Sequence, residues 1–292
     1  MLTGAGAAVP AAALSGEKLN GLPTGRSSMT MDLIRGIAAV GLLFYAATHI
    51  PILGFFISLL IPVLVLFYRL KLGRRIGGIV PVVSGGVMLA TLGGASFEAL
   101  FFIELMVLGF AMGELLERGG SVERTILTAA GVVLGSGAAC LIGHAAAAGV
   151  GPGAMVTAYV DRNLQMTMAL YQSVGMADEV MQALAESLDA IRFFLVRILP
   201  ALAVSSVLVA AWTTLLIARP AARRYGLAFP DFGRLNQWRP PEFLVWGAIA
   251  SGILLLLPDK NLRMIGVNGL IILMTVYFFS GIAIISFFLE KK

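Results

Sequence analysis

The chain has 292 residues, of which 59% are hydrophobic and only 13% are charged, and its mean hydropathy is +0.92. A soluble domain of this size carries about 25% charged residues, so the composition excludes an ordinary soluble protein and indicates a polytopic membrane protein. The formal net charge of +5 is explained by membrane topology and by attraction to anionic lipid, so we expect a lipid bilayer and no nucleic acid as partner.

The first thirty residues differ in composition from the rest of the chain. Residues 1–30 are rich in Gly, Ala, Ser and Pro, and they lack the basic region and apolar core of a cleavable signal peptide. This composition predicts a disordered tail, followed by a single transmembrane domain over residues 31–292. An alternative is that translation begins at Met29 or Met31, because Met31 directly opens the first apolar stretch.

Eight apolar stretches follow this tail. A helix of roughly 20 apolar residues crosses a hydrocarbon core about 30 Å thick. The sequence therefore predicts an all-α, polytopic transmembrane bundle of about eight spans, joined mostly by short turns. The predicted spans are 32–50, 52–68, 76–92, 97–116, 125–147, 189–218, 242–258 and 264–288.

The Lys and Arg residues fall mainly on one side of these spans. If the N-terminus is cytoplasmic, 16 of the 21 basic residues lie at the cytoplasmic side. Cytoplasmic loops of membrane proteins are enriched in Lys and Arg, so we predict that both termini face the cytoplasm of a bacterial inner membrane. The outer side then holds Arg162, Arg192, Arg197, Lys260 and Arg263.

Residues 148–188 form the one long connection that this topology places outside. They are too polar to span a membrane, yet apolar residues recur in them every three to four positions, which is typical of an amphipathic helix. We expect one or two such helices on the outer surface, with a structural role or as a lid over a binding site. The apolar positions are Val156, Val160, Leu164, Met168, Tyr171, Val180, Leu184 and Leu188.

Ionisable residues inside the predicted spans are the main candidates for a site, because a charge in a membrane is costly unless it is paired or hydrated. Glu98 lies near the outer end of the fourth span, and Glu104 lies roughly 9 Å deeper at 1.5 Å per residue. Arg192 and Arg197 occupy similar depths in the sixth span, so we expect Glu104 to pair with Arg197. Pro200 follows one turn later and predicts a kink.

Three further polar residues lie in or beside the outer halves of their spans, namely His144, Arg263 and Asn268. Together with the two acidic and two basic residues above, they could line a polar cavity that opens to the outside and binds a substrate. The alternatives are a purely structural Glu104–Arg197 pair and a histidine that is only part of the core. The candidate substrate-binding residues are Glu98, Glu104, His144, Arg192, Arg197, Arg263 and Asn268.

The motifs of common membrane enzymes are missing from the sequence. There is no G-x-x-x-x-G-K-[ST] phosphate loop, no Cys/His or Asp/Glu cluster with metal-ligand spacing, and the single cysteine, Cys140, excludes an intramolecular disulfide. Ser136 and His144 lie on one helix, roughly 12 Å apart at 1.5 Å per residue, which is too far for a catalytic dyad. We therefore expect no enzymatic activity, no metal and no cofactor.

Two glycine pairs have the spacing that lets membrane helices approach closely. They are Gly109-x-x-x-Gly113 in the fourth predicted span and Gly131-x-x-x-Gly135 in the fifth. Small residues four apart place two helix backbones in van der Waals contact. We expect both pairs to serve helix packing.

A resemblance to a known family rests on two C-terminal segments. The first is Phe232-Gly233-Arg234 followed by Trp238-Arg239-Pro240-Pro241-Glu242-Phe243-Leu244-Val245-Trp246, and the second is the end of the last hairpin, Phe287-Phe288-Leu289-Glu290. These segments, the hydropathy pattern and an early hairpin that contains a proline together resemble the YybS-like family of predicted bacterial membrane proteins. The resemblance covers about residues 31–290.

That family is distantly similar to the substrate-binding components of energy-coupling-factor vitamin transporters. The resemblance implies a protein that binds a small molecule from the outside and docks onto a separate membrane coupling subunit with cytoplasmic ATPases. Such components often carry two alanines four apart on the first helix for docking. This chain departs from that pattern, since Leu42 follows Ala38 and Leu43 follows Ala39.

Two functions therefore follow from the sequence. The first is a small-molecule binding or transport component of the cytoplasmic membrane. The second is a membrane scaffold or envelope assembly factor without enzymatic activity, with residues 219–241 and the outer helices as contact surfaces. An outward cavity lined by Glu98, Glu104, Arg197 and Asn268 would favour the first function.

Overall fold

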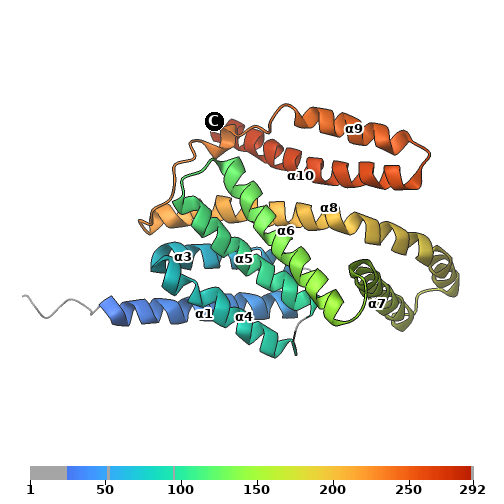
Figure 1. The fold of residues 1–292 in the computed structure, drawn as a ribbon, viewed down its shortest axis with the longest axis horizontal. Coiled ribbons are helices and arrows are strands. Elements are labelled where there is room, and N and C mark those ends of the chain that lie inside the picture. The colour runs from blue at the N-terminus through green and yellow to red at the C-terminus, as the bar shows by residue number, and fades with distance from the viewer. Residues whose placement is uncertain (1–24, 51–52, 95, 291–292) are drawn as a thin grey trace, which may run out of the picture.

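The computed structural model describes residues 25–50, 53–94 and 96–290, and every regular element in them is helical (Figure 1). The structure is therefore all-α, as the composition predicts. The elements are α1 (Gly25–His49), α2 (Gly54–Ser58), α3 (Ile61–Gly77), α4 (Ile79–Thr91), α5 (Phe97–Glu117), α6 (Val122–Ala147), α7 (Pro152–Ser173), α8 (Asp178–Arg224), the 3-10 turn η1 (Leu235–Gln237), α9 (Leu244–Leu256) and α10 (Lys260–Glu290).

Each of the eight predicted spans coincides with an apolar helix or helix pair. Within the described ranges, six segments are long and apolar enough to cross a membrane. Helices α4 and α9 have 13 residues each, or about 20 Å at 1.5 Å per residue, which is shorter than a hydrocarbon core about 30 Å thick. The structure thus supports a multi-pass protein, and a crossing by α4 or α9 stays a prediction.

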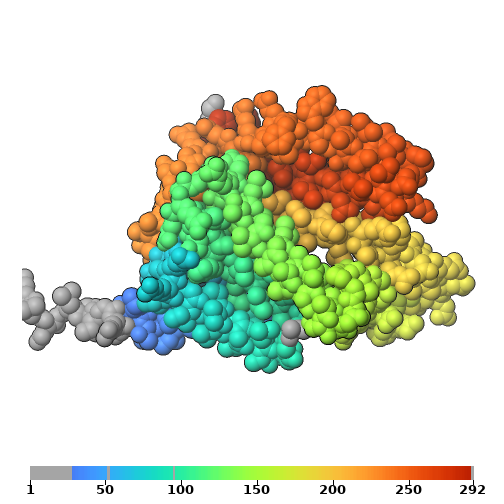
Figure 2. Space-filling model, viewed as in Figure 1, coloured from blue at the N-terminus to red at the C-terminus, as the bar shows by residue number. Residues whose placement is uncertain are grey.

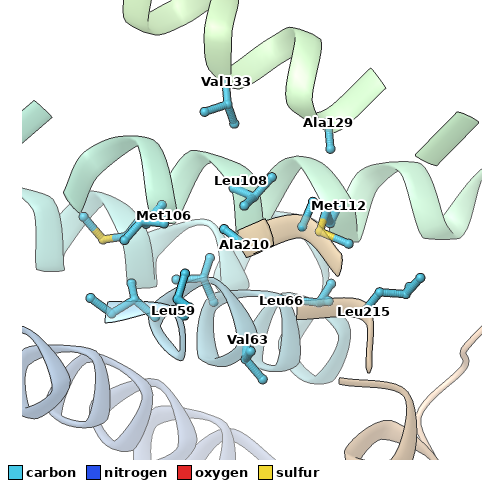
Figure 3. Packing of buried hydrophobic residues seen from close by; sticks show 14 of the residues in the cluster. Leu59, Val63, Leu66, Met106, Leu108, Met112, Ala129, Val133, Ala210 and Leu215 are labelled. Atoms are coloured by element: carbon cyan, nitrogen blue, oxygen red, sulfur yellow. The ribbon is translucent and has the colours of Figure 1, made fainter. Parts of the chain in front are cut away.

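The centre of the bundle is formed by α3 and α5, which pack on each other and on α8. Figure 3 shows apolar side chains from α3, α5, α6 and α8 meeting in this core. Ile61, Val65 and Leu66 on α3 are fully buried, as is Met112 on α5. Because lipid is as apolar as these side chains, close van der Waals packing holds the helices together.

The predicted role of the first glycine pair is confirmed by this packing. A Cβ added to Gly109 would lie 2.4 Å from the carbonyl oxygen of Pro62, and one added to Gly113 would lie 2.5 Å from Cγ of Arg69. Helix α5 can therefore approach α3 only where it has no side chain. The prediction is wrong within this chain for Gly131 and Gly135, because nothing lies within 4 Å of a Cβ added to either.

The predicted outer segment forms α7 and the first part of α8. Helix α8 has 47 residues, or about 70 Å at 1.5 Å per residue, and continues without a break from the amphipathic segment into the sixth predicted span. Helix α7 packs against α8 and lies beside its N-terminal part at one end of the molecule (Figure 1). Val160 is the buried residue of α7, and the placement of this end outside the cell stays a prediction.

The last two helices form a hairpin along one side of the molecule, drawn orange to red in Figure 2. Helix α9 packs on α10, and α10 packs on α8 and η1. Two glycines permit the close contact within the hairpin, since a Cβ on Gly269 would lie 2.4 Å from Oγ of Ser251 and one on Gly266 would lie 2.6 Å from the Ser251 carbonyl oxygen.

The N-terminal tail was predicted to extend to residue 30. Residues 1–24 lie outside the described part of the chain, but α1 begins at Gly25, so residues 25–30 are helical. The polar residues of this stretch extend the first apolar helix, whose long apolar segment runs from Ser28 to His49.

Candidate functional site

Glu104 lies on α5 at its contact with α6. Its Oε2 atom accepts a hydrogen bond of 2.8 Å from the Ser136 hydroxyl, and Gly137 leaves room for the carboxylate beside the α6 backbone. The residue also lines a crevice of about 50 Å³ between α2, α5, α6 and α8. The partner of this carboxylate is therefore a serine, at a hydroxyl–carboxylate contact between neighbouring helices.

The predicted ion pair between Glu104 and Arg197 is wrong. Arg197 is exposed, and its guanidinium lies over the ring of Phe193, 3.5 Å from the ring centroid. On the same helix, the neighbouring residues Ile198 and Ala201 are buried. Equal depth in a membrane fixes the height of two side chains, but the rotation of each helix decides whether they face each other.

Asn268 on α10 has a structural role beside Pro200 of α8. Its Nδ2 atom donates to the carbonyl oxygen of Arg197 at 2.9 Å, and its Oδ1 atom accepts from the backbone N–H of Ala201 at 3.1 Å. An uninterrupted helix pairs those two backbone groups with each other. Because Pro200 has no N–H and disturbs this turn, the amide of Asn268 serves as a partner for both groups.

The remaining candidate residues lie apart from one another. Arg192 pairs with Asp161 of α7 at 3.5 Å and with Asp189 of its own helix. Arg263 donates to the carbonyl oxygen of Leu257 at 3.3 Å, and Glu98 is exposed in the first turn of α5. The four residues expected to line one outward cavity, Glu98, Glu104, Arg197 and Asn268, thus occupy separate environments.

A different hollow lies near the predicted outer ends of α4, α5 and α6. This outer groove has a volume of about 240 Å³, and its walls are mainly apolar. The polar groups in its lining are the Ser96 hydroxyl, the Cys140 thiol and the His144 imidazole. Its lining residues are Leu89, Ser96, Phe97, Ala99, Leu100, Ile103, Cys140, Leu141 and His144.

Local sequence determines the start of α5 and the turn before it at this end of the bundle. Ser96 caps α5, because its hydroxyl accepts from the Ala99 N–H at 3.1 Å. The preceding turn needs Gly93 and Gly94, whose φ angles are +74° and +120°. Beside the groove, the rings of Phe97 and Tyr159 pack at a tilt with centroids 4.5 Å apart, so α7 packs against the wall of the groove.

An ionic cluster that the sequence did not predict joins the middle of α3 to the C-terminal end of α5, away from the outer groove. Arg69 is fully buried and donates to both carboxylates of α5, at 2.8 Å from Nε to Glu114 and 2.8 Å from Nη1 to Glu117. Arg74 adds a second contact to Glu114 at 3.2 Å. The sequence contained a signal for this cluster. Glu114 and Glu117 lie at the predicted cytoplasmic end of the span 97–116, and Arg69 lies at the predicted cytoplasmic end of the span 52–68.

The segment between α8 and α9 is anchored at this same end. Trp238 donates from Nε1 to Glu123 of α6 at 2.7 Å and packs edge-on against Trp212 of α8, with ring centroids 4.6 Å apart. Arg219 of α8 donates to the carbonyl oxygen of Gly233 at 2.6 Å. These contacts fix the connection that the sequence analysis treated only as a contact surface over residues 219–241.

No group of three or more His, Cys, Asp or Glu side chains that could hold a metal ion occurs in the part of the chain that the structure describes. The fold and these sites define the class of the protein as an integral, multi-pass α-helical membrane protein. The chain belongs to the family described as "Predicted membrane protein (DUF2232)", which matches residues 37–292. No curated protein and no solved structure matches the chain.

Proposed function

We propose that the protein is a small-molecule binding component of the bacterial cytoplasmic membrane, and that its ligand occupies the outer groove. The observation that carries this proposal is a concave, mainly apolar hollow with a few polar groups, which is the usual composition of a ligand site. A volume of about 240 Å³ suits a small ligand. The lining favours an apolar molecule with one polar group that reaches Ser96 or His144.

The position of α7 supports controlled access to this groove. The contact between the rings of Phe97 and Tyr159 joins the groove wall to α7, and the Arg192–Asp161 pair ties α7 to α8. A change in the position of α7 would therefore alter the groove directly. In this proposal the amphipathic outer helix acts as the lid.

Transport by such a component requires a partner that couples it to energy. The resemblance to energy-coupling-factor components suggests a separate membrane subunit with cytoplasmic ATPases, which would contact α1. Ala38 and Leu42 lie on the exposed side of α1, whereas Val40 and Phe44 are buried. The side of α1 that carries Ala38 and Leu42 is therefore exposed in this chain, although Leu42 makes it bulkier than a pair of alanines, whereas Leu43 packs against the core.

The second candidate function is a membrane scaffold without enzymatic activity. It is favoured by the contacts of Arg192 and Asn268, which bind neighbouring groups of the chain instead of lining an open polar cavity. In a scaffold the outer groove would hold ordinary lipid, and the exposed α1 face would bind a structural partner.

Native mass spectrometry of the purified full chain separates the two functions. Leu100→Trp and Ile103→Trp would each fill the outer groove, whereas Leu127→Trp adds the same ring to an exposed position on α6. We expect a co-purifying molecule to be lost from both groove variants and kept by the control. If no bound molecule other than bulk lipid depends on the groove, the binding function is wrong and the scaffold is favoured.

A further inference from the structure

A second groove, which we call the arginine groove, lies at the end of the bundle opposite the outer groove. It has a volume of about 410 Å³ and is formed by the last turns of α8 and α10 and by the segment that precedes and includes η1. Its lining residues are Arg219, Pro220, Arg223, Gly233, Arg234, Leu235, Asn236, Ser286 and Glu290. Three of them are arginines.

The charges in and around this groove do not cancel. Asp231 is shared by Arg219 and Arg223, at 3.3 Å and 3.6 Å, and Glu290 accepts a hydrogen bond of 2.6 Å from the Asn236 amide. Arg234 has no ion pair in the described part of the chain. Three guanidinium groups thus face two carboxylates, one of which is already engaged by an amide.

Within the described ranges, the lining of this groove also holds buried polar atoms without a hydrogen-bond partner, namely an acceptor, Oδ1 of Asn236, and a donor on Arg219. The side chain of Arg219 is only 15% exposed, and its Nε atom is buried without a hydrogen-bond partner among the described residues. Buried donors are nearly always paired in proteins, so an unpaired guanidinium N–H indicates that an acceptor is missing. Ser286 adds a hydroxyl to the groove wall.

The groove lies where a membrane protein meets lipid headgroups. Arg219 and Arg223 lie in the last two turns of one apolar helix, and Ser286 and Glu290 lie at the end of another. A neighbouring hollow of about 490 Å³ shares Asn236 with the groove and continues over the apolar side chains of α10. The apolar lining residues of that hollow on α10 are Ile284, Phe287 and Phe288.

We propose that the arginine groove binds a phosphate group, carried either by a phospholipid headgroup or by a soluble phosphate compound. Guanidinium groups match the geometry of phosphate oxygens and bind them by charge-assisted hydrogen bonds. Basic pockets between membrane helices bind anionic headgroups in the same way. The adjoining apolar hollow favours the lipid, because it would hold an acyl chain beside the headgroup.

The test uses the full chain, purified and stripped of lipid, in native mass spectrometry. The probes are phosphatidylglycerol, diacylglycerol with the same acyl chains and inorganic phosphate. The groove variant is Arg223→Gln with Arg234→Gln. The control, Arg118→Gln with Arg224→Gln, removes two exposed arginines near the same end that do not line the groove.

If the groove binds lipid, phosphatidylglycerol should bind the groove variant at least about tenfold more weakly than it binds the unsubstituted protein. Its affinity for the control variant should be nearly the same as for the unsubstituted protein. Diacylglycerol should bind no protein form specifically. If inorganic phosphate alone shows this dependence on the groove, the phosphate comes from a soluble compound. If neither phosphate probe depends on the groove, or the control loses as much, the arginines act only as general surface charge and the proposal is overturned.

A second variant keeps the test decisive if the arginine variant fails to fold. Ser286→Trp fills the groove and leaves every charge in place. It should weaken phosphatidylglycerol or phosphate binding as strongly as the arginine variant does. Unchanged binding to a monodisperse Ser286→Trp protein would overturn the proposal by itself.

Discussion

Arg69 is buried between α3 and α5, and the two carboxylates that bind it differ in their surroundings. The side chain of Glu114 is 18% exposed and contacts both Arg69 and Arg74, whereas that of Glu117 is 55% exposed. A buried ion pair is costly to break because the remaining charge stays in a poorly solvated place. Glu117 accepts two hydrogen bonds from Arg69, at 2.8 Å and 2.7 Å, but its own carboxylate is largely open to water, which can solvate it and weakens the pair.

This difference predicts unequal effects of two matched substitutions. Glu114→Gln should lower the free energy of unfolding by about 3 kcal/mol, since it removes the less exposed partner of a buried charge. Glu117→Gln should lower it by less than about 1 kcal/mol. Unfolding in mixed detergent micelles measures both values, and equal losses would contradict the expected difference between the two carboxylates.

Asn268 illustrates how one side chain can pair with the backbone of a neighbouring helix beside a proline. Its amide bonds to the backbone of Arg197 and Ala201 on either side of Pro200. We expect Asn268→Leu to destabilise the protein by about 1–3 kcal/mol, because it leaves two backbone groups without that partner.

The cause can be tested with a second substitution. In a Pro200→Ala background a regular helix can pair its own backbone groups, so Asn268→Leu should cost clearly less there than in the natural sequence. A double-mutant cycle of unfolding free energies measures this coupling. If the losses of unfolding free energy from Asn268→Leu and Pro200→Ala simply add, Asn268 acts independently of Pro200.

At the scale of helices, the two glycine pairs have the same spacing but different neighbours. Gly109 lies against the backbone of α3, while Gly135 faces open space. Gly109→Ala should therefore destabilise the protein by about 1–3 kcal/mol through overpacking. Gly135→Ala should be neutral in the isolated protein, and thermal unfolding in detergent compares the two variants.

The same pair of variants is informative in the native membrane. If Gly135→Ala weakens the protein there but not after purification, α6 has a partner that the isolated chain lacks. If both variants are neutral in detergent, the close approach of α3 and α5 is not set by Gly109.

At the scale of the whole molecule, the orientation predicted from charge can be tested with exposed positions. Gln165 on α7 and Ala228 after α8 are both exposed, whereas Val160 is buried and would label poorly. Cys140 is also exposed, so it is first replaced by Ser. In cells made permeable only at the outer membrane, an impermeant thiol reagent should label Gln165→Cys and not Ala228→Cys.

The opposite pattern of labelling would invert the topology and place the arginine groove outside. Labelling of both cysteines in intact spheroplasts would contradict a single orientation. A lysed sample, in which both variants should react, controls for the accessibility of each thiol.

The sequence by itself determined the class of this protein and the positions of its helices. Long apolar runs must form helices in lipid, because every backbone polar group needs a partner within the segment. The predicted spans follow from that local rule, whereas the close contact at Gly109 and Gly113 was predicted from the spacing of two small residues. The sequence also located the amphipathic residues between the fifth and sixth predicted spans, although it could not show that part of them continues into the sixth span as one helix.

Only the tertiary structure decided which polar groups meet. The depth of a residue follows from its position in a span, but the rotation of its helix depends on packing against several others. Glu104 therefore binds Ser136 instead of Arg197, and Asn268 binds the backbone at Pro200. The two grooves are formed by helix ends far apart in the sequence, so no local sequence pattern predicts them.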